Sequence, residues 1–169
     1  TEKEYKNLNY TKIIEKAIEL LAQGKILAAK GIGGYLLMCD ATNGEAINLL
    51  RERKHRPTKP FAVMYPNVDY LGKEYQINDE ERESLTNEVA YIVLLRKKES
   101  TKLSIEEDLI APGISRIGCM IPYAPLYQMI LDRFQKPVVA TSGNVSGSPI
   151  IFEDEAAIKE LGSIADALL

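Results

Sequence analysis

The fold is decided by the stretch Ile26-Leu27-Ala28-Ala29-Lys30-Gly31-Ile32-Gly33-Gly34-Tyr35-Leu36-Leu37-Met38-Cys39, in which a glycine-rich loop joins two apolar runs. Residues 26–30 and 35–39 are short and mostly apolar, which is typical of buried β-strands. Gly31 to Gly34 interrupt them as a loop, because glycine is the strongest local breaker of regular structure. The stretch therefore predicts a strand, a tight connection and a second strand.

The flanking sequence alternates in the same way between helical and strand-like patterns. Apolar residues recur at helical spacing from Ile13 to Leu21, with Gly24 placed to end that helix, and residues 1–12 are a polar lead-in. Asn43 is a plausible cap for the next helix. Further strands are expected at 61–65, 91–95, 117–121 and 138–141, and further helices at 67–74, 79–87 and 125–134, with a polar, mobile loop over 97–109. The pattern predicts an α/β domain with a mixed, largely covered sheet.

Composition narrows the class of protein. The chain has 169 residues, of which 46% are hydrophobic and 27% charged, so it can bury the core of one globular domain. No run approaches the length of a membrane span and the N-terminal residues lack the apolar core of a signal peptide, so we expect a cytoplasmic protein with no membrane partner. Because the chain begins without methionine and ends in an apolar run, we also expect it to be part of a longer protein.

Positive charge is concentrated between residues 51 and 61. Five basic residues against Glu52 give this segment a net charge of +4, whereas the whole chain carries −3; they are Arg51, Arg53, Lys54, Arg56 and Lys59. A locally basic loop on an acidic protein indicates a compact anionic ligand, and a polyphosphate fits well because arginine binds its oxygens bidentately. The acidic total argues against a broad nucleic-acid surface.

Two loops are candidate sites for the rest of such a ligand. The loop that starts at Lys30 and Gly31 does not match the dinucleotide pattern, yet its backbone N–H groups could approach an anion, with a plain turn as the alternative. The loop from Thr141 to Pro149 follows an apolar strand and is rich in hydroxyl and amide groups, which suit phosphate or ribose oxygens. An ordinary turn is again the alternative.

Several other residues are weaker candidates. His55 is the only histidine, and we expect a solvated loop residue. Asp40 and Glu52 could each approach Mg²⁺, but a surface or capping role is favoured for both, and no metal ligands are assigned. Cys39 and Cys119 lie 80 positions apart in apolar runs, so two buried thiols are expected.

Six segments occur in an order that resembles the YrdC-like domain of HypF-type hydrogenase maturation carbamoyltransferases, from about Leu20 to the C-terminus. The most specific are the block K-H-R-P-x-K-P-F-A-V-M and the block T-S-G-N-x-S-G-x-P-I. The segments are Ala29–Tyr35, Cys39–Asn43, Arg51–Met64, Ala111–Gly113, Met120–Leu126 and Thr141–Asn144. The resemblance predicts a YrdC-like domain over residues 13–169.

This resemblance implies an open, twisted mixed α/β sheet with helices and a concave basic cleft that binds ATP and an adenylate. In the family branch, carbamate from carbamoyl phosphate reacts with ATP to give carbamoyl-adenylate, and a separate domain passes the carbamoyl group to a hydrogenase maturation partner protein. Lys54 and Arg56 match the K-x-R pair, which would hold triphosphate and carboxylate-like oxygens as catalytic residues. Ser142 and Asn144 match the S-x-N pair, which would hold adenylate phosphate or ribose.

The residues themselves support the same chemistry. Attack of carbamate on a polyphosphate brings two anions together, so catalysis requires charge neutralisation and positioning. Lys30, Gly31, Lys59 and Thr141 are further candidates for ATP or adenylate contacts, and Mg²⁺ would be held mainly by the nucleotide. Leu36 stands where the family commonly has histidine, and the sequence ends before a family segment that adds to the nucleotide site.

Two other functions stay open from the sequence. One is threonylcarbamoyl-adenylate synthesis for tRNA modification, which the glycine loop and the strand at 61–64 disfavour. The other is an RNA-binding module that uses the basic loop, and it predicts an RNA affinity that falls steeply with salt.

Overall fold

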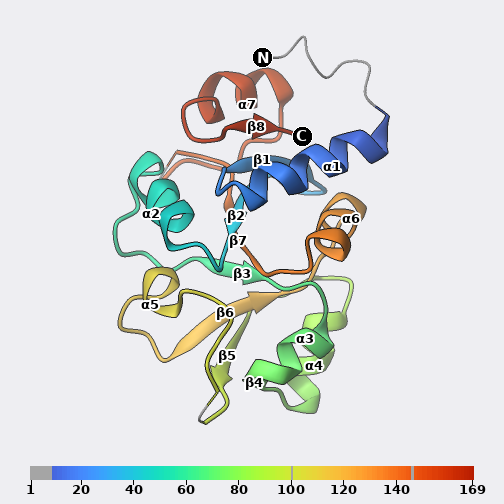
Figure 1. Cartoon of the computed structure of the whole chain (residues 1–169), viewed down its shortest axis with the longest axis vertical. Coiled ribbons are helices and arrows are strands. Elements are labelled where there is room, and N and C mark those ends of the chain that lie inside the picture. The colour runs from blue at the N-terminus through green and yellow to red at the C-terminus, as the bar shows by residue number, and fades with distance from the viewer. Residues whose placement is uncertain (1–8, 100, 146) are drawn as a thin grey trace.

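The computed structural model describes residues 9–99, 101–145 and 147–169, which form one open eight-stranded sheet with helices on both faces (Figure 1). The strand order is β4-β5-β6-β3-β7-β2-β1-β8. Pairs β3–β6 and β1–β8 are parallel and the others antiparallel, so the sheet is mixed, as predicted. The strands are β1 Leu27–Gly31, β2 Gly34–Asp40, β3 Ala62–Met64, β4 Tyr75–Gln76, β5 Val93–Lys97, β6 Arg116–Met120, β7 Val138–Ser142 and β8 Ala167–Leu168.

Helix boundaries follow local capping chemistry. Asn9 caps the N-terminus of α1 through its side chain. Gly24 follows the C-cap Gln23, and its φ of +74° stops the helix there. Asn43 caps α2 by accepting from the N–H groups of Glu45 and Ala46, as predicted, and Pro125 opens α6. The helices are α1 Tyr10–Ala22, α2 Gly44–Arg53, α3 Val68–Glu74, α4 Asp79–Thr86, α5 Glu107–Ile110, α6 Pro125–Phe134 and α7 Asp154–Leu161.

The two faces of the sheet are covered unequally. Helices α1 and α6 pack on one face, where they bury Leu27, Ala29 and Met38 of β1 and β2. The other five helices pack on the opposite face, in the cluster that contains Ala28 and Leu37. Because α1 and α6 lie over the β8 end of the sheet, the same face is left open over β3, β6 and β5 (Figure 1).

The structure differs from the sequence predictions at a few elements. Helix α1 begins at Tyr10, so the last part of the expected lead-in is helical. Residues 1–8 of that lead-in lie outside the described part of the chain. The polar segment 97–109, predicted to be a mobile loop, instead buries Leu103 and Ile105 and leads into α5. Elements β4, α7 and β8 were not predicted, and β8 forms from the apolar end of the chain beside β1.

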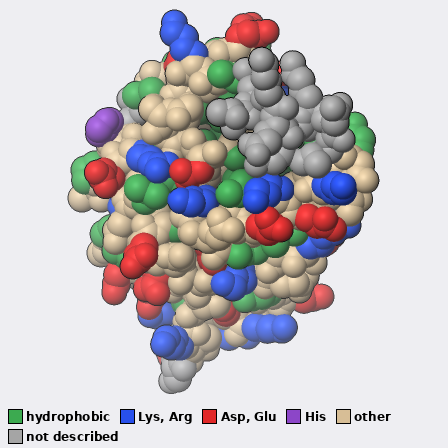
Figure 2. All heavy atoms as spheres, turned by 45° about the horizontal axis from the view of Figure 1, so that its top comes forward, with side chains coloured by type: hydrophobic (Ala, Val, Ile, Leu, Met, Phe, Trp, Pro, Cys, Tyr) green, Lys and Arg blue, Asp and Glu red, His purple; other side chains and the backbone are tan. Residues whose placement is uncertain are grey.

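Charge on the outer surface is mixed. On the face seen in Figure 2, lysine and arginine side chains are mixed with aspartate and glutamate side chains, and the described residues form no broad area of one sign. Within the described residues, no helix combines the length and the apolarity that crossing a bilayer requires.

Candidate functional site

A cavity of about 740 Å³ lies on the open half of the sheet. Its floor is hollow because three small residues stand side by side: Gly118 on β6 pairs with Ala62 on β3, which pairs with Ala140 on β7. A Cβ atom at Gly118 would come within 3.0 Å of the Ile92 side chain. The cavity is therefore built by side-chain size as well as by the missing helix cover.

The rim of this cleft combines apolar and polar groups. Ile92 and Leu94 project into it from the β5 side, and both are more than half exposed. Arg56 enters from the loop after α2, and Thr141 and Ser142 from the end of β7. The cleft thus offers an apolar surface next to guanidinium and hydroxyl groups.

Arg51 holds the basic loop in shape. Its buried guanidinium donates to the carbonyl oxygens of Leu109 (2.6 and 2.8 Å), Arg56 (2.8 Å) and Lys59 (3.2 Å). It also stacks over the ring of Phe61, with 4.5 Å from Cζ to the ring centroid. Burial lowers the pKa of Arg51. This arginine ties the loop to α5 and is not available to a ligand.

The turn after α2 then reverses the chain. His55 has a φ of +50°, its N–H donates to Glu52, and the N–H of Arg56 donates to Arg51. These two bonds are those of a Schellman motif, in which glycine usually takes the left-handed position. His55 is exposed, as predicted (purple in Figure 2), and its backbone conformation is what directs Arg56 toward the cleft.

Lys54 lies beneath the cleft and is only 1% exposed. Its Nζ donates to Ser142 O (2.6 Å), Asn144 O (2.8 Å) and Asn144 Oδ1 (2.7 Å). Burial, with smaller effects from Arg56 and Lys59, lowers the pKa of Lys54 to about 8. The three acceptors act in the opposite direction because they stabilise the ammonium form. All three N–H donors of the ammonium group are therefore occupied by the 142–144 loop.

The basic loop thus presents less charge to a ligand than its sequence indicates. Arg51 and Lys54 are buried, and Arg53 donates to Ile164 O and Asp166. Arg56 and the exposed Lys59 remain. The guanidinium of Arg56 is half-buried against the Phe61 ring and bonded to loop carbonyls, and burial together with Arg51 lowers its pKa. Of the basic residues expected to neutralise a ligand from this segment, Arg56 therefore lines the cleft and the exposed Lys59 lies outside its lining.

The loop after β7 is fixed by backbone contacts with β2. Gly143 donates to Tyr35 O at 2.7 Å and accepts from Ile151 at 2.9 Å, while a Cβ atom at Gly143 would lie 2.6 Å from that Tyr35 oxygen. Ser142 Oγ donates to Asn144 Oδ1 at 2.8 Å. The structure therefore brings Lys54, Ser142 and Asn144 together in one network, with Arg56 and Thr141 at the adjoining cleft. Ser146 lies outside the described residues.

Lys30 and Gly31 are placed differently. Lys30 forms an exposed ion pair with Asp154, which also accepts from Tyr35 at 3.0 Å. Gly31 makes room for Tyr127, whose hydroxyl oxygen would lie 2.3 Å from a Cβ atom there. Neither is among the described residues that line the cleft, and contact of either with a nucleotide stays a prediction.

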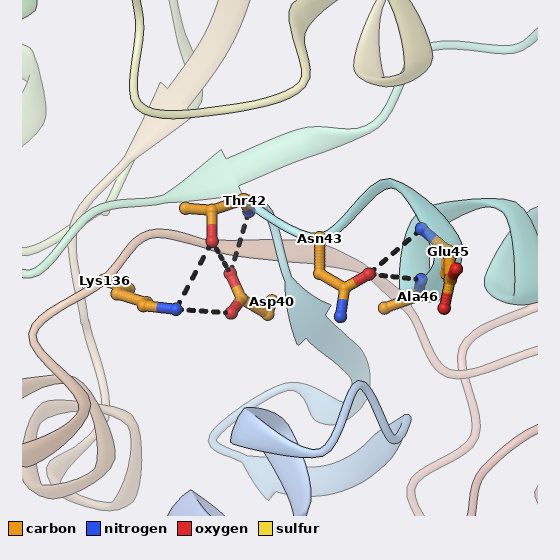
Figure 3. A network of polar contacts seen from close by, with 6 residues as sticks. All are labelled: Asp40, Thr42, Asn43, Glu45, Ala46 and Lys136. Carbon is orange, nitrogen blue, oxygen red and sulfur yellow. Dashed lines mark hydrogen bonds and ion pairs between the residues drawn. The ribbon is translucent and has the colours of Figure 1, made fainter.

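Asp40, which was considered as a Mg²⁺ ligand, is instead part of the scaffold. Figure 3 shows that buried Asp40 accepts from Thr42 N and Oγ, at 2.8 and 2.7 Å, and from Lys136 at 3.0 Å, next to the Asn43 cap of α2. Among the described residues no three His, Cys, Asp or Glu side chains gather as a metal site would require. Cys39 and Cys119 are free and buried, as predicted, and burial raises both thiol pKa values.

Sequence reasoning missed Arg116, which lines the cleft at the start of β6. The signal was present as a lone arginine directly before an apolar strand. Its position became visible only with the register of β6 against β5.

Comparison with known proteins shows which sequences this chain resembles. Residues 19–169 match the sequence profile of the Sua5/YciO/YrdC family, which carries the description telomere recombination. The chain is 47% identical over 153 residues to the carbamoyltransferase HypF of Synechocystis sp., covering 90% of this chain and 20% of that protein. It is 26% identical to the threonylcarbamoyl-AMP synthase of Vibrio campbellii, covering 94% of this chain and 86% of that enzyme.

Solved structures of related proteins have a similar fold. Full-length HypF in its phosphate- and nucleotide-bound form has a TM-score of 0.86 at 41% identity, covering 92% of this chain and 24% of that chain. P. abyssi Sua5 complexed with L-threonine has a TM-score of 0.75 at 20% identity, covering 92% of this chain and 45% of that chain, a likeness of fold alone. The chain spans about a fifth of the length of the HypF relatives it matches.

Proposed function

This chain belongs to the Sua5/YciO/YrdC family, and we propose that it joins carbamate to ATP to form carbamoyl-adenylate. A carbamate oxygen attacks the α-phosphorus of ATP, and the bond from that phosphorus to the bridging oxygen of the β-phosphate breaks. Pyrophosphate leaves with the electron pair of that bond. The carbamate derives from carbamoyl phosphate, as the resemblance to HypF implies.

The observation that carries the proposal is the cleft itself. Its apolar floor suits a base and ribose, and Arg56 with the hydroxyls of Thr141 and Ser142 suits phosphate oxygens. Because attacking group and substrate are both anionic, neutralisation at Arg56 would lower the barrier most when charge moves onto the pyrophosphate. Lys54 would act on the adenylate through the 142–144 loop that it holds.

A divalent cation fits this scheme only through the nucleotide. Since the described residues contain no acidic or histidine cluster, Mg²⁺ would be held by the phosphates of ATP, whose charge it would partly neutralise. The residues of the chain would then bind and orient the nucleotide around it.

The context of the reaction comes from the relatives. Because the HypF relatives are about five times longer, we propose that further domains of a parent protein supply carbamate and pass the carbamoyl group to a hydrogenase maturation partner. The second candidate, threonylcarbamoyl-adenylate synthesis, is favoured by the coverage of 86% of one such synthase, but the identity of 26% is much lower than the 47% to HypF. RNA binding is disfavoured because few cations of the basic loop face solvent.

Calorimetric titration with ATP and Mg²⁺, followed by exchange of labelled pyrophosphate into ATP, tests the proposal. Wild-type protein should bind ATP, and exchange should require carbamate or carbamoyl phosphate. Arg56→Ala should lose both, whereas Arg133→Ala, an exposed arginine at the end of α6, should keep both. Exchange supported by threonine with bicarbonate, and not by carbamate, would assign the second candidate instead.

A further inference from the structure

Two arginines face each other on the open face of the sheet, beyond the hollow floor. Arg96 on β5 pairs with Arg116 on β6, two residues along from the pair Leu94 and Gly118. Side chains two apart on a strand point to the same side, so both arginines project on the face that carries the cleft. In an antiparallel pair, directly opposite side chains are close neighbours.

These two guanidinium groups are not neutralised. Within the described residues, the ion pairs of the chain include neither Arg96 nor Arg116. Arg116 donates to Leu94 O at 3.5 Å, a long contact, and both side chains are exposed. Like charges directly opposite on a sheet are destabilising, so this arrangement favours an anion between the two groups.

A separate hollow of about 510 Å³ surrounds the pair. Its lining is mostly polar. Gln76 on β4 pairs with Arg96, and Asn78 and Glu81 lie at the start of α4. Glu81 is its one acidic group among the described residues, and the carboxylate already accepts from Asn78 N at 2.9 Å in a capping box. Two positive charges therefore face one negative charge, which leaves the lining of the hollow with a net positive charge.

Arg116 connects this hollow to the cleft, because its side chain lines both. On the cleft side, Arg56 donates to the carbonyl oxygen of Pro60. Strands β3 and β6 are parallel and Ala62 pairs with Gly118. Pro60 and Arg116 each precede that pair by two residues, so they lie at the same end of the two strands. Arg56, Arg116 and Arg96 thus follow one another along one edge of the open face.

We propose that Arg96 and Arg116 form a second oxyanion site that takes a pyrophosphate-class anion at the exit of the cleft. Two arginines can each bind phosphoryl oxygens bidentately, and a diphosphate offers oxygens toward both. The mostly polar hollow offers little apolar surface to a base, so an inorganic anion fits better than a nucleoside. The site stands on its own geometry; only its role as the path of the released product rests on the proposed function.

Titration with inorganic pyrophosphate tests the site directly. We expect Arg96→Gln and Arg116→Gln each to weaken pyrophosphate binding at least about 10-fold, since each removes a bidentate charged contact. Arg133→Gln removes an exposed arginine from α6 and should bind as wild type does. Because Arg96 does not line the cleft, Arg96→Gln should leave AMP affinity unchanged.

The outcomes separate the two proposals. Loss of pyrophosphate binding in Arg56→Gln but not in Arg96→Gln would place the anion in the cleft and overturn the second site, as would absence of pyrophosphate binding by wild type. Pyrophosphate binding that depends on Arg96 in a protein without affinity for ATP would support the second site and contradict the adenylation proposal. If Arg96→Gln weakened the binding of ATP but not that of free pyrophosphate, the two arginines would bind only the phosphates of an intact nucleotide. That result would also overturn the proposal.

Discussion

Lys54→Met is the change that best separates scaffold from ligand contact in this site. Methionine keeps the length of the side chain but removes the ammonium group from Ser142 O, Asn144 O and Asn144 Oδ1. A buried hydrogen bond contributes about 1 kcal/mol net, so three lost bonds predict a loss of about 3 kcal/mol in the free energy of unfolding. The loop that carries Ser142 would also lose its anchor.

Urea denaturation followed by far-ultraviolet circular dichroism measures this loss. With an m value near 2 kcal/mol/M, the midpoint should fall by roughly 1.5 M. Arg56→Met is the control: its half-buried guanidinium contacts exposed loop carbonyls, so the cost should stay below about 1 kcal/mol. Nucleotide affinity should fall in both variants. A Lys54→Met protein as stable as wild type but unable to bind nucleotide would refute the reasoning and make Lys54 a ligand contact.

The same residue predicts a pH dependence. Burial lowers the pKa of Lys54 from 10.5 to about 8 in the folded state, so between those values the unfolded chain binds more protons. The unfolding free energy of wild type, relative to Lys54→Met, should therefore rise by ~3 kcal/mol from pH 8 to 10.5, and the gain should be lost over the same interval as pH falls. Comparison with the variant cancels the tyrosines that titrate in the same range. A flat difference would contradict a folded-state pKa of Lys54 that burial holds below its usual value.

The other predictions concern backbone strain, close approach and thiol burial. His55→Gly should stabilise the fold by about 1 kcal/mol in thermal unfolding, whereas His55→Ala should not, since only glycine relieves a positive φ. Gly143→Ala should cost at least ~2 kcal/mol and weaken nucleotide binding because its Cβ meets a backbone oxygen, while Gly72→Ala in α3, where nothing lies within 4 Å, should stabilise slightly. Cys39 and Cys119 should stay unmodified by a thiol reagent until the protein unfolds.

Elements with a strong local signal could be predicted from the sequence. Pro125 opens α6 and Asn43 caps α2 as expected, because both effects depend on residues within one turn. Strand β8 could not be predicted, since its two residues are extended only by pairing with β1. The segment around Leu103 and Ile105 was misjudged because its apolar residues are sparse, and their burial depends on the distant core they meet.

The contacts of the candidate site could be predicted even less well from the sequence, because they join residues far apart in the chain. The sequence indicates which cations are close along the chain, but their partners lie far away: Arg51 bonds to Leu109, 58 positions on, and Lys54 to Ser142, 88 positions on. Local charge therefore could not show that these two side chains turn inward. Arg116 was missed for a related reason, since its neighbour Arg96 is set by strand register and not by sequence distance.

Inward-facing cations give the cleft a rigidity that a loop of free charges would lack. A flexible arginine or lysine loses side-chain entropy when a ligand fixes it, and that loss subtracts from affinity. Here Arg51 fixes the loop and Lys54 fixes the opposite rim, both before any ligand arrives, so that Arg56 and Ser142 are already positioned on either side of the hollow floor. The fold thus uses part of its local positive charge to place the remainder: of the basic residues between 51 and 61, Arg56 is the one that lines the cleft, while Arg51 and Lys54 hold the backbone around it.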